Sequence, residues 1–436
     1  MRRLLEQAKT ISDKAEVFSS NLITDSVIFE NGKLQDIDTK VQLGTSLRII
    51  KDNKLGFAYT KNLRNRKEFL DNCLASLKGC IEAKFDFPLT KSTPRLKTYS
   101  TSLSKLSNRD LVDECQRICE LVSSRTKGQC NITTGDSIEK VRIMNSAGTD
   151  IKMRTSEYAI IVSIVYPNSY AALRRLFTRK AFEKIQEKEL TMMIDLYRQS
   201  SRTVNPKGKK MKVLFMPESM YTLTWRLQSA TNGAAVYEKQ SPISNQIGKR
   251  LFNRELSIYN DPLDDRLPGA RSVDDEATPC RHFPIVENGV LKNFYYDLFY
   301  AQKNNVEPTG HGFKTARWSG ETIALKPSPS LQHLHIKTGE VSLEQLIESM
   351  DQGIIVAGAL GAHSGNILNG DFSIGLSPGL YVENGEVIGR VNEAMVAGNI
   401  YDIMQRILGI ENTAHATHAG VFPAILFDDV SVATTN

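Results

Sequence analysis

The sequence predicts an α+β fold, rich in hairpins of antiparallel sheet with flanking helices and ending in a large, mostly β C-terminal domain. The main observation is a hairpin pattern, Asn-Gly between apolar residues, that occurs at 29–34, 286–291 and 382–387. A two-residue type I′ turn needs positive φ at both central positions, and Asn followed by Gly adopts it at low cost. Amphipathic stretches with helical spacing, lying between the β-like segments, predict the flanking helices.

The first predicted unit covers residues 1–87. Its opening residues are apolar at helical spacing and predict a helix over 2–19. Residues 64–84 return to helical spacing. Between the two helices lie four β-like runs joined by Asn-Gly and Asp-Asn turns, at 26–30, 34–40, 44–50 and 54–60. The unit is therefore predicted as helix, strand meander, helix.

A connector rich in Pro, Ser, Thr and Lys leads to a second predicted unit, residues 108–204. It opens with a helix over 108–124. Three β-like segments follow, the longest at 156–166, and the Asn-Ser-Ala-Gly turn at 145–148 separates two of them. A charged helix is predicted over 179–200.

The third predicted unit covers residues 212–436. It begins with a buried-type strand at 213–216, and Pro217 then favours the start of a helix over 218–230. The remainder is Gly-rich and β-like. Two helices interrupt it, at 342–350 and 400–408.

Composition narrows the class of protein. The 436 residues suggest about two to four domains. The net charge of +6 is mild, and the densest basic cluster, residues 207–212, is shorter than the stripe typical of a nucleic-acid-binding face. We therefore expect no nucleic-acid partner.

The chain shows neither a secretory signal nor a long apolar segment. The N-terminus lacks an apolar h-region, and no run reaches the roughly 18 apolar residues that span a bilayer. We expect a cytoplasmic protein with reduced thiols and no membrane partner. Cys115 and Cys119 lie one helical turn apart, which favours core packing over zinc binding because no second Cys or His pair follows at finger spacing.

The seven histidines do not form a known metal motif. No His-Glu dipeptide occurs, so the zinc helix with two histidines bracketing a Glu base is missing. His333 and His335 alternate along a predicted strand and would share a face, which suits a metal but suits a solvent face better. His311 and His363 lie in Gly-rich turns where functional residues are often found, although hydrogen-bonded loop imidazoles are the more frequent case.

Other catalytic motifs are also missing. There is no Gly-x-Ser-x-Gly elbow, and no Gly-Lys-Ser/Thr follows the Gly-rich stretch 353–370. The triplet Asp274-Asp275-Glu276 could bind a cation. Three adjacent carboxylates point in different directions, however, so a surface loop or carboxylates accepting backbone N–H groups is favoured.

A series of short segments resembles the TldD/PmbA family, historically labelled modulators of DNA gyrase and associated with zinc-dependent peptide hydrolysis. In the C-terminal half the matching segments are 272–276, 286–291, 308–312, 339–347, 353–356, 369–373, 379–386 and 397–400. The Asn31-Gly32 turn with the 44–59 meander resembles the family's N-terminal region, and 145–148 resembles its middle region. The resemblance covers most of the chain.

That family has two kinds of subunit. The TldD kind carries His-Glu-x-x-x-His on a helix of the third unit and a distant Cys, which bind zinc; the PmbA kind, also called TldE, lacks them. Here the corresponding stretch, 232–240, offers Tyr237 and Glu238 but no histidine, and no cysteine follows Cys280. The resemblance thus implies a PmbA/TldE-like chain with no catalytic or metal-binding residue and no cofactor of its own. Zinc is expected in a TldD-like partner subunit.

The resemblance also implies two sets of positions. The candidate substrate-cavity residues are Tyr237, Glu238, His311, His363 and Asp371. The structural positions of the family signature are Asp274, Asp275, Glu276, Asn288, Gly289, Gly370, Asn384 and Gly385. Ala277 stands where the family usually has Gly, and because Ala resists positive φ the turn conformation there is in question.

The expected function is that of the subunit without zinc in a TldD/TldE-type metallopeptidase complex acting in proteolysis or maturation of unstructured peptides. Such a subunit would close the cavity and hold extended polypeptide, which can add as a strand to a free sheet edge. Two alternatives are a binding module for DNA gyrase or DNA, and a metalloenzyme with an unrecognised site that uses His311, His363, Asp371 or the tail histidines. Homodimer formation is left open.

Overall fold

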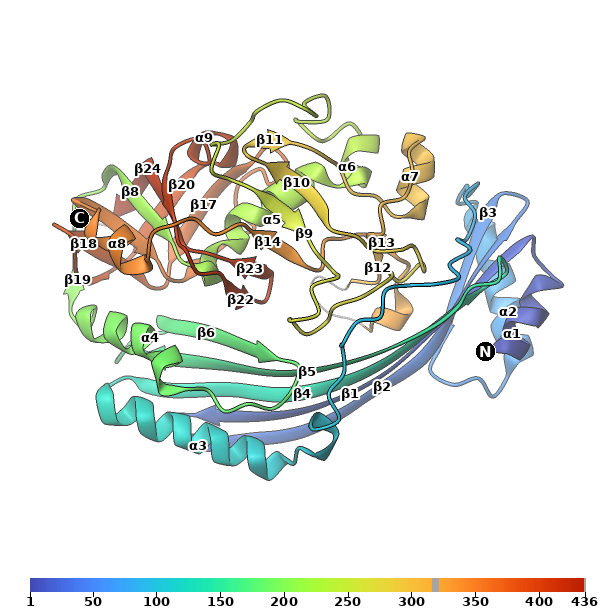
Figure 1. Cartoon of the computed structure of the whole chain (residues 1–436), viewed down its shortest axis with the longest axis horizontal. Helices are drawn as coiled ribbons and strands as arrows, with labels where there is room; N and C mark the ends of the chain where they lie inside the picture. Colours follow the sequence, from blue (N-terminus) through green and yellow to red (C-terminus); the bar gives the residue numbers. More distant parts are fainter. Residues whose placement is uncertain (316–320, 435–436) are drawn as a thin grey trace.

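A long, curved antiparallel sheet runs beneath a larger C-terminal part in the computed structural model, which describes residues 1–315 and 321–434 (Figure 1). The strand order of this sheet is β3-β2-β1-β4-β5-β6. The strands are β1 (Lys14–Glu30), β2 (Lys33–Lys51), β3 (Lys54–Thr60), β4 (Gln129–Asn145), β5 (Asp150–Val165) and β6 (Ala172–Arg179). Because β1 pairs with β4 from residue 16 to residue 29, the units predicted at 1–87 and 108–204 share one sheet.

The tight turns form as predicted. Asn31 and Gly32 have φ of 49° and 68°, and the Asn288-Gly289 and Asn384-Gly385 turns have φ of 49° and 77°, and 50° and 80°. These positive values are those of a type I′ turn. The 145–148 turn joins β4 to β5 and is also confirmed.

Four helices flank the long sheet: α1 (Arg2–Lys9), α2 (Arg66–Ala75), α3 (Asn108–Arg125) and α4 (Glu187–Gln199). Helix α3 lies along the convex face and α4 near the end where β6 lies (Figure 1). Ser107 begins α3 with a capping box, in which its side chain accepts from the Asp110 N–H and Asp110 accepts in return. The apolar side of α3 is buried through Leu111, Ile118 and Val122, which fixes the helix against the sheet.

Four predicted helices are wrong in extent. The opening helix ends at Lys9, and residues 14–19 belong to β1; the helix at 64–84 ends at Ala75 and is followed by a short 3-10 turn. The helix at 179–200 begins only at Glu187, and that at 400–408 ends at Ile403 before another strand. In β1 the cause is burial on both faces, since Ala15 and Phe18 are both buried and lie on opposite sides of the strand. When both faces of a strand are buried, apolar residues occupy both, so the sequence does not show the apolar–polar alternation by which a strand is recognised.

The C-terminal part contains two further sheets and a short two-stranded one. The first has the order β11 (Val290–Leu291), β10 (Phe283–Glu287), β9 (Ile258–Asn260), β14 (Leu334–Ile336), β23 (Gly420–Phe422), β22 (His415–Thr417). The second has the order β16 (Ala359–Leu360), β17 (Asp371–Leu376), β20 (Ala394–Asn399), β24 (Ile425–Thr434), β8 (Lys209–Phe215), β15 (Gln352–Val356), β18 (Gly379–Glu383), β19 (Glu386–Val391), β7 (Thr203–Val204), with β21 (Ile407–Ile410) paired to β24. The mostly β character expected of this region is confirmed.

Helices fill and cover the C-terminal sheets: α5 (Tyr221–Thr231), α6 (Gly233–Tyr237), α7 (Leu298–Asn304), α8 (Leu343–Glu348) and α9 (Ile400–Ile403). The largest apolar core gathers side chains of α5 with those of both sheets, among them Phe215, Leu223 and Phe427. A second cluster joins α3, α4 and β4–β6 to β8, β15, β18 and α8. The long sheet and the C-terminal part are therefore held together by shared buried side chains.

Across residues 1–315 and 321–434, no helix is long and apolar enough to cross a membrane.

Candidate functional site

A cleft of about 400 Å³ lies between the concave face of the long sheet and the C-terminal part. The sheet contributes alternate residues of β4 and β5, which point to one face because strand side chains alternate: Ser137, Glu139, Thr155 and Glu157. The opposite wall carries three imidazoles, His333, His335 and His418. A second cleft, of about 500 Å³, adjoins the first at Ala416. We call the two clefts together the interdomain groove.

The three imidazoles of the first cleft are neutral at pH 7. Burial lowers the pKa of His333 to about 4 and also lowers the pKa values of His335 and His418. The His335 ring stacks on Tyr259 at a centroid distance of 5.1 Å. Its Nε2 atom is buried and has no hydrogen-bond partner within the described residues. A buried nitrogen in that state favours a ligand group able to hydrogen-bond to it.

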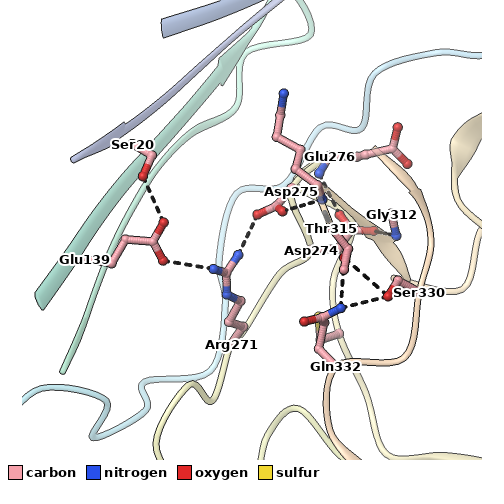
Figure 2. A network of polar contacts seen from close by, with 12 residues as sticks. Ser20, Glu139, Arg271, Asp274, Asp275, Glu276, Gly312, Thr315, Ser330 and Gln332 are labelled. Carbon is pink, nitrogen blue, oxygen red and sulfur yellow. Dashed lines mark hydrogen bonds and ion pairs between the residues drawn. The ribbon is translucent and has the colours of Figure 1, made fainter. Parts of the chain in front are cut away.

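An ion network connects the floor of the cleft to the C-terminal part (Figure 2). Glu139 of β4 accepts hydrogen bonds from Ser20 at 2.9 Å and from the Arg271 guanidinium at 3.1 Å, and Arg271 also donates to Asp275 at 2.5 Å. Such charge-assisted bonds are stronger than neutral ones. Arg271 therefore holds the concave face of the sheet at a fixed place relative to the histidine wall.

Arg175, His415 and Glu411 of the second cleft form a polar chain that continues to Glu218, outside the cleft. His415 receives a hydrogen bond at Nδ1 from Arg175 of β6, and its Nε2–H donates to Glu411 at 2.9 Å. A guanidinium can only donate and a carboxylate can only accept, so the tautomer of His415 is fixed. Arg175 also lies 3.7 Å from Glu218, whose pKa is raised by burial. The chain links β6 to the C-terminal sheets next to the groove.

The acidic triplet is a buried structural hub. Asp274 accepts the backbone N–H groups of Glu276 at 2.9 Å, of Thr278 at 2.8 Å and of Gly312 at 2.9 Å. Asp275 accepts the Lys314 N–H. The interpretation as carboxylates that accept backbone N–H groups is confirmed, and the triplet is buried rather than on a surface loop.

Glu276, the third member of the triplet, connects the C-terminal part to the long sheet. Glu276 accepts from Arg48 of β2 at 2.5 Å and from the Leu298 N–H at 2.7 Å, and Arg48 also donates to Glu16 of β1 at 2.9 Å. All three charged side chains are at least 96% buried. Next to them burial lowers the pKa of Lys314 to about 7, helped by the Arg48 charge.

The turn at Ala277 keeps a left-handed conformation despite its side chain. The φ of Ala277 is 63°. A non-Gly residue in this region costs roughly 1–2 kcal/mol. The buried contacts of the acidic triplet around it hold the turn in place.

Two candidate cavity residues are at the surface and one is in the core. Tyr237 and Glu238 are exposed at the end of α6, with the Tyr237 ring 6.3 Å from that of Tyr300 on α7. His311 is 1% exposed; its ring lies between those of Phe283 and Tyr295, and burial lowers its pKa to about 3.

The other two candidates lie at the start of β17. His363 is exposed in the loop before this strand, and Asp371 begins the strand and accepts from Asn399 at 2.8 Å. The fully buried Arg226 of α5 pins this loop, since it donates to the backbone carbonyls of Ser364 and Asp371. The five candidates thus lie in three separate places: the end of α6, the core, and the start of β17. None of the five lines the interdomain groove.

A metal site is not formed by the side chains that the structure describes. Among residues 1–315 and 321–434 no group of three or more His, Cys, Asp or Glu side chains is arranged to hold a metal ion. His333 and His335 do share one cleft, as the strand alternation predicts, but without a third ligand.

Two of the four lysines of the basic cluster at 207–212 form ion pairs with neighbouring acids. Lys210 lies 2.8 Å from Asp429, and Lys212 lies 2.9 Å from Asp351. Paired lysines offer little free charge to a phosphate backbone.

Comparison with known families decides the identity of the fold. The model of the PmbA/TldA metallopeptidase C-terminal domain matches residues 208–434, more than half of the chain, and the model of PmbA/TldA metallopeptidase domain 1 matches residues 15–84. The chain belongs to the PmbA/TldD family.

Relatives of this PmbA/TldD family member cover nearly its whole length. An uncharacterized protein of Methanocaldococcus jannaschii is 25% identical over 415 residues, 92% of each chain. A metalloprotease PmbA homolog of Buchnera aphidicola is 21% identical, over 99% of this chain and 96% of the relative. The crystal structure of TldE from Thermococcus kodakarensis has the same fold, with a TM-score of 0.90 and 22% identity over 99% of both chains.

Sequence reasoning missed most of the groove of this PmbA/TldD family member. Glu139, Glu157 and Arg271 were not expected there, although Ser137 with Glu139 and Thr155 with Glu157 show the period of two that marks one strand face. That pattern could have identified a polar face. It could not have shown that His333, His335 and His418 lie opposite.

Proposed function

We propose that this chain is the subunit of a two-subunit peptidase that holds an extended, unstructured polypeptide in the interdomain groove, while a TldD-like partner supplies the zinc and the water-activating base. The single observation that carries the proposal is the groove itself. Its first cleft, of about 400 Å³, runs between the long sheet and the wall of neutral imidazoles, and the second cleft, of about 500 Å³, adjoins it.

The lining of the groove suits a peptide backbone. Thr155, Thr178 and Ser137 provide hydroxyl groups that both donate and accept. The neutral imidazole of His335 has an unpartnered Nε2 that can hydrogen-bond to a peptide group. Recognition through backbone groups would not depend on one substrate sequence, in line with a role in degrading unstructured chains.

The role without zinc is supported by the sequence. The stretch 232–240, where a TldD-like chain would carry its zinc helix, has Tyr237 and Glu238 but no histidine. The exposed end of α6 that carries them would then face the partner or its substrate, as would His363 and Asp371. His311, which is in the core, would instead support the histidine wall, because it bonds to Asn260 at 3.2 Å and Asn260 accepts from the His333 N–H at 2.8 Å.

The test is reconstitution with a zinc-bearing TldD-like subunit and reduced, unfolded β-casein as the probe. The purified lone chain is expected to hold no stoichiometric zinc and to leave casein intact, and adding the partner restores chelator-sensitive cleavage. Ser137→Trp, which fills the first cleft, is expected to abolish most of that cleavage. The matched control is Lys140→Trp, on the opposite face of β4, which should cleave like the unmodified complex.

Two results would contradict the proposal. One is stoichiometric zinc together with chelator-sensitive proteolysis in the lone chain. The other is a reconstituted complex in which Ser137→Trp and Lys140→Trp cleave casein equally well, because the groove would then not carry the substrate.

A further inference from the structure

Glu157 brings a charge to the first cleft that no described residue balances. It lies on β5 opposite Ser137 of β4, and both side chains line the cleft. Its carboxylate accepts a hydrogen bond from the Thr178 hydroxyl at 2.8 Å and forms no ion pair within residues 1–315 and 321–434. A hydroxyl is neutral, so this hydrogen bond orients the carboxylate without cancelling its charge.

The other charged side chains of the first cleft are already paired. Glu139 lies diagonal to Glu157 on the same face of the sheet and is bound by Arg271, which also donates to Asp275 (Figure 2). Arg271 is the one Lys or Arg in the described lining of this cleft, and its charge is shared between two carboxylates. The first cleft therefore has an excess of negative charge at Glu157.

The second cleft has no such excess. Its described lining carries three basic and three acidic side chains: Arg175, Arg179, Lys188, Glu189, Glu344 and Glu411. Opposite charges in equal number favour neither a cation nor an anion. A preference for charge would therefore arise in the first cleft alone.

The histidine wall opposite Glu157 can accept a cation. Its imidazoles are neutral at pH 7, so they do not repel a positive charge. The His335 side chain is 6% exposed, and its Nε2 atom has no hydrogen-bond partner within the described residues. An unprotonated imidazole nitrogen accepts an N–H group, and a buried polar atom without a partner indicates a missing ligand group.

We propose that the first cleft binds a positively charged group of the polypeptide, with Glu157 as the residue that determines this specificity and His335 Nε2 as a second acceptor. The inference rests on the proposed function and names the class of substrate, an unstructured segment that carries an ammonium or guanidinium group. Such a group comes from a Lys or Arg side chain or from the N-terminus of the polypeptide. Both sources offer N–H donors, which form their strongest hydrogen bonds with a carboxylate.

Fluorescence anisotropy with the purified full chain tests the inference. The probes are labelled, unstructured peptides capped at both ends that differ only in a central Lys, Gln or Glu. The Lys peptide is expected to bind about tenfold more tightly than the Glu peptide. The net charge of +6 on the protein favours the Glu peptide, so the opposite preference must come from a local site.

Two variants of Glu157 connect the preference to this residue. Glu157→Gln keeps the size of the side chain and an oxygen that accepts from Thr178, and it should bind the Lys and Glu peptides with nearly equal affinity. Glu157→Lys should reverse the preference, which loss of a merely structural residue would not do. The matched control is Glu120→Gln, exposed on α3 at the convex face, which removes the same charge and should keep the tenfold preference. Circular dichroism checks that each variant is folded.

A further pair of probes identifies the source of the charge. These are the Gln peptide with a free N-terminus and the same peptide acetylated. Tighter binding of the free amino group that is lost in Glu157→Gln supports the inference and assigns the charge to the N-terminus. A preference for Lys among the capped peptides supports it and assigns the charge to a side chain.

The inference is overturned if all of the peptides bind with the same affinity, or if a preference for the cationic peptides survives in Glu157→Gln. In either case the groove still binds polypeptide, so the proposed function stands. Failure of the chain to bind any of the peptides would overturn both the inference and the proposed role of the groove.

Discussion

Arg48 of β2 donates a 2.5 Å hydrogen bond to Glu276 of the C-terminal part, across 228 residues of sequence and out of contact with solvent. Arg48 also neutralises Glu16 of the neighbouring strand. Two carboxylates thus depend on one cation in a buried place. Removing one partner of a buried ion pair destabilises a protein far more than replacing the whole pair with apolar residues, because it leaves a buried charge without a counter-ion.

Replacing Arg48 with Met is expected to destabilise the fold by about 3–5 kcal/mol, because Glu16 and Glu276 then remain buried without the cation that hydrogen-bonds to both of them. The free energy of urea unfolding measures the loss. The control is Arg109→Met on α3, whose side chain is 88% exposed beside Asp113 and whose removal should change the free energy by less than about 1 kcal/mol. Equal unfolding free energies for the two variants would contradict the role given to Arg48.

Asp136 is expected to make the protein less stable as the pH rises from 4 to 7. It lies directly opposite Asp25 in the β1–β4 ladder, and burial, with the Asp25 charge, raises its pKa from 3.8 to about 7. A folded-state pKa above the unfolded value means that the folded state binds the proton more tightly. The stabilisation is complete below the unfolded pKa and is lost as pH rises through the folded pKa, by up to about 4 kcal/mol.

The measurement is urea unfolding of the unmodified protein and of Asp136→Asn at several pH values between 4 and 8. Asp136→Asn cannot ionise, so its unfolding free energy should decline less over this range. Asp113→Asn, at an exposed position of α3, serves as the control and should follow the unmodified protein. The idea fails if Asp136→Asn shows the same decline.

Gly289→Ala is expected to cost more stability than Gly248→Ala. Both glycines have positive φ, 77° and 84°, so both alanines carry the left-handed penalty of about 1–2 kcal/mol. A Cβ atom at Gly289 would lie 2.3 Å from the Phe252 carbonyl oxygen, whereas one at Gly248 would meet nothing within 4 Å. Thermal unfolding of the two variants measures the loss of stability and separates backbone strain from steric clash. Equal losses of stability would show that the hairpin moves to avoid the clash.

His335→Phe is expected to weaken polypeptide binding in the groove several-fold while keeping the fold. Phenylalanine can still stack on Tyr259 but loses the unpartnered Nε2. The His282 ring packs at a tilt against the same Tyr259, with a centroid distance of 4.8 Å, and is not among the groove residues, so His282→Phe is the matched control. Fluorescence anisotropy with labelled, unfolded casein measures the affinity, and equal affinities for both variants would exclude Nε2 from recognition.

The site was predictable only in part, for a physical reason. The alternation in β4 and β5 marks a polar strand face, and the spacing of His333 and His335 places both in one cleft. Sequence spacing has no information on which distant segments lie opposite each other. It therefore gave no expectation that Glu139 would meet Arg271, 132 residues away.

The sequence by itself determined the local structure: the Asn-Gly turns, whose positive φ values follow from two adjacent residues, and α3, whose capping box and apolar side are contained in residues 107–125. Only the tertiary structure decided the joining of the first two units into one sheet, the burial of Arg48 with Glu16 and Glu276, and the groove. Turns and caps depend on neighbours along the chain. Ion pairs and clefts depend on contacts between segments hundreds of residues apart, whose energy exists only once the chain has folded.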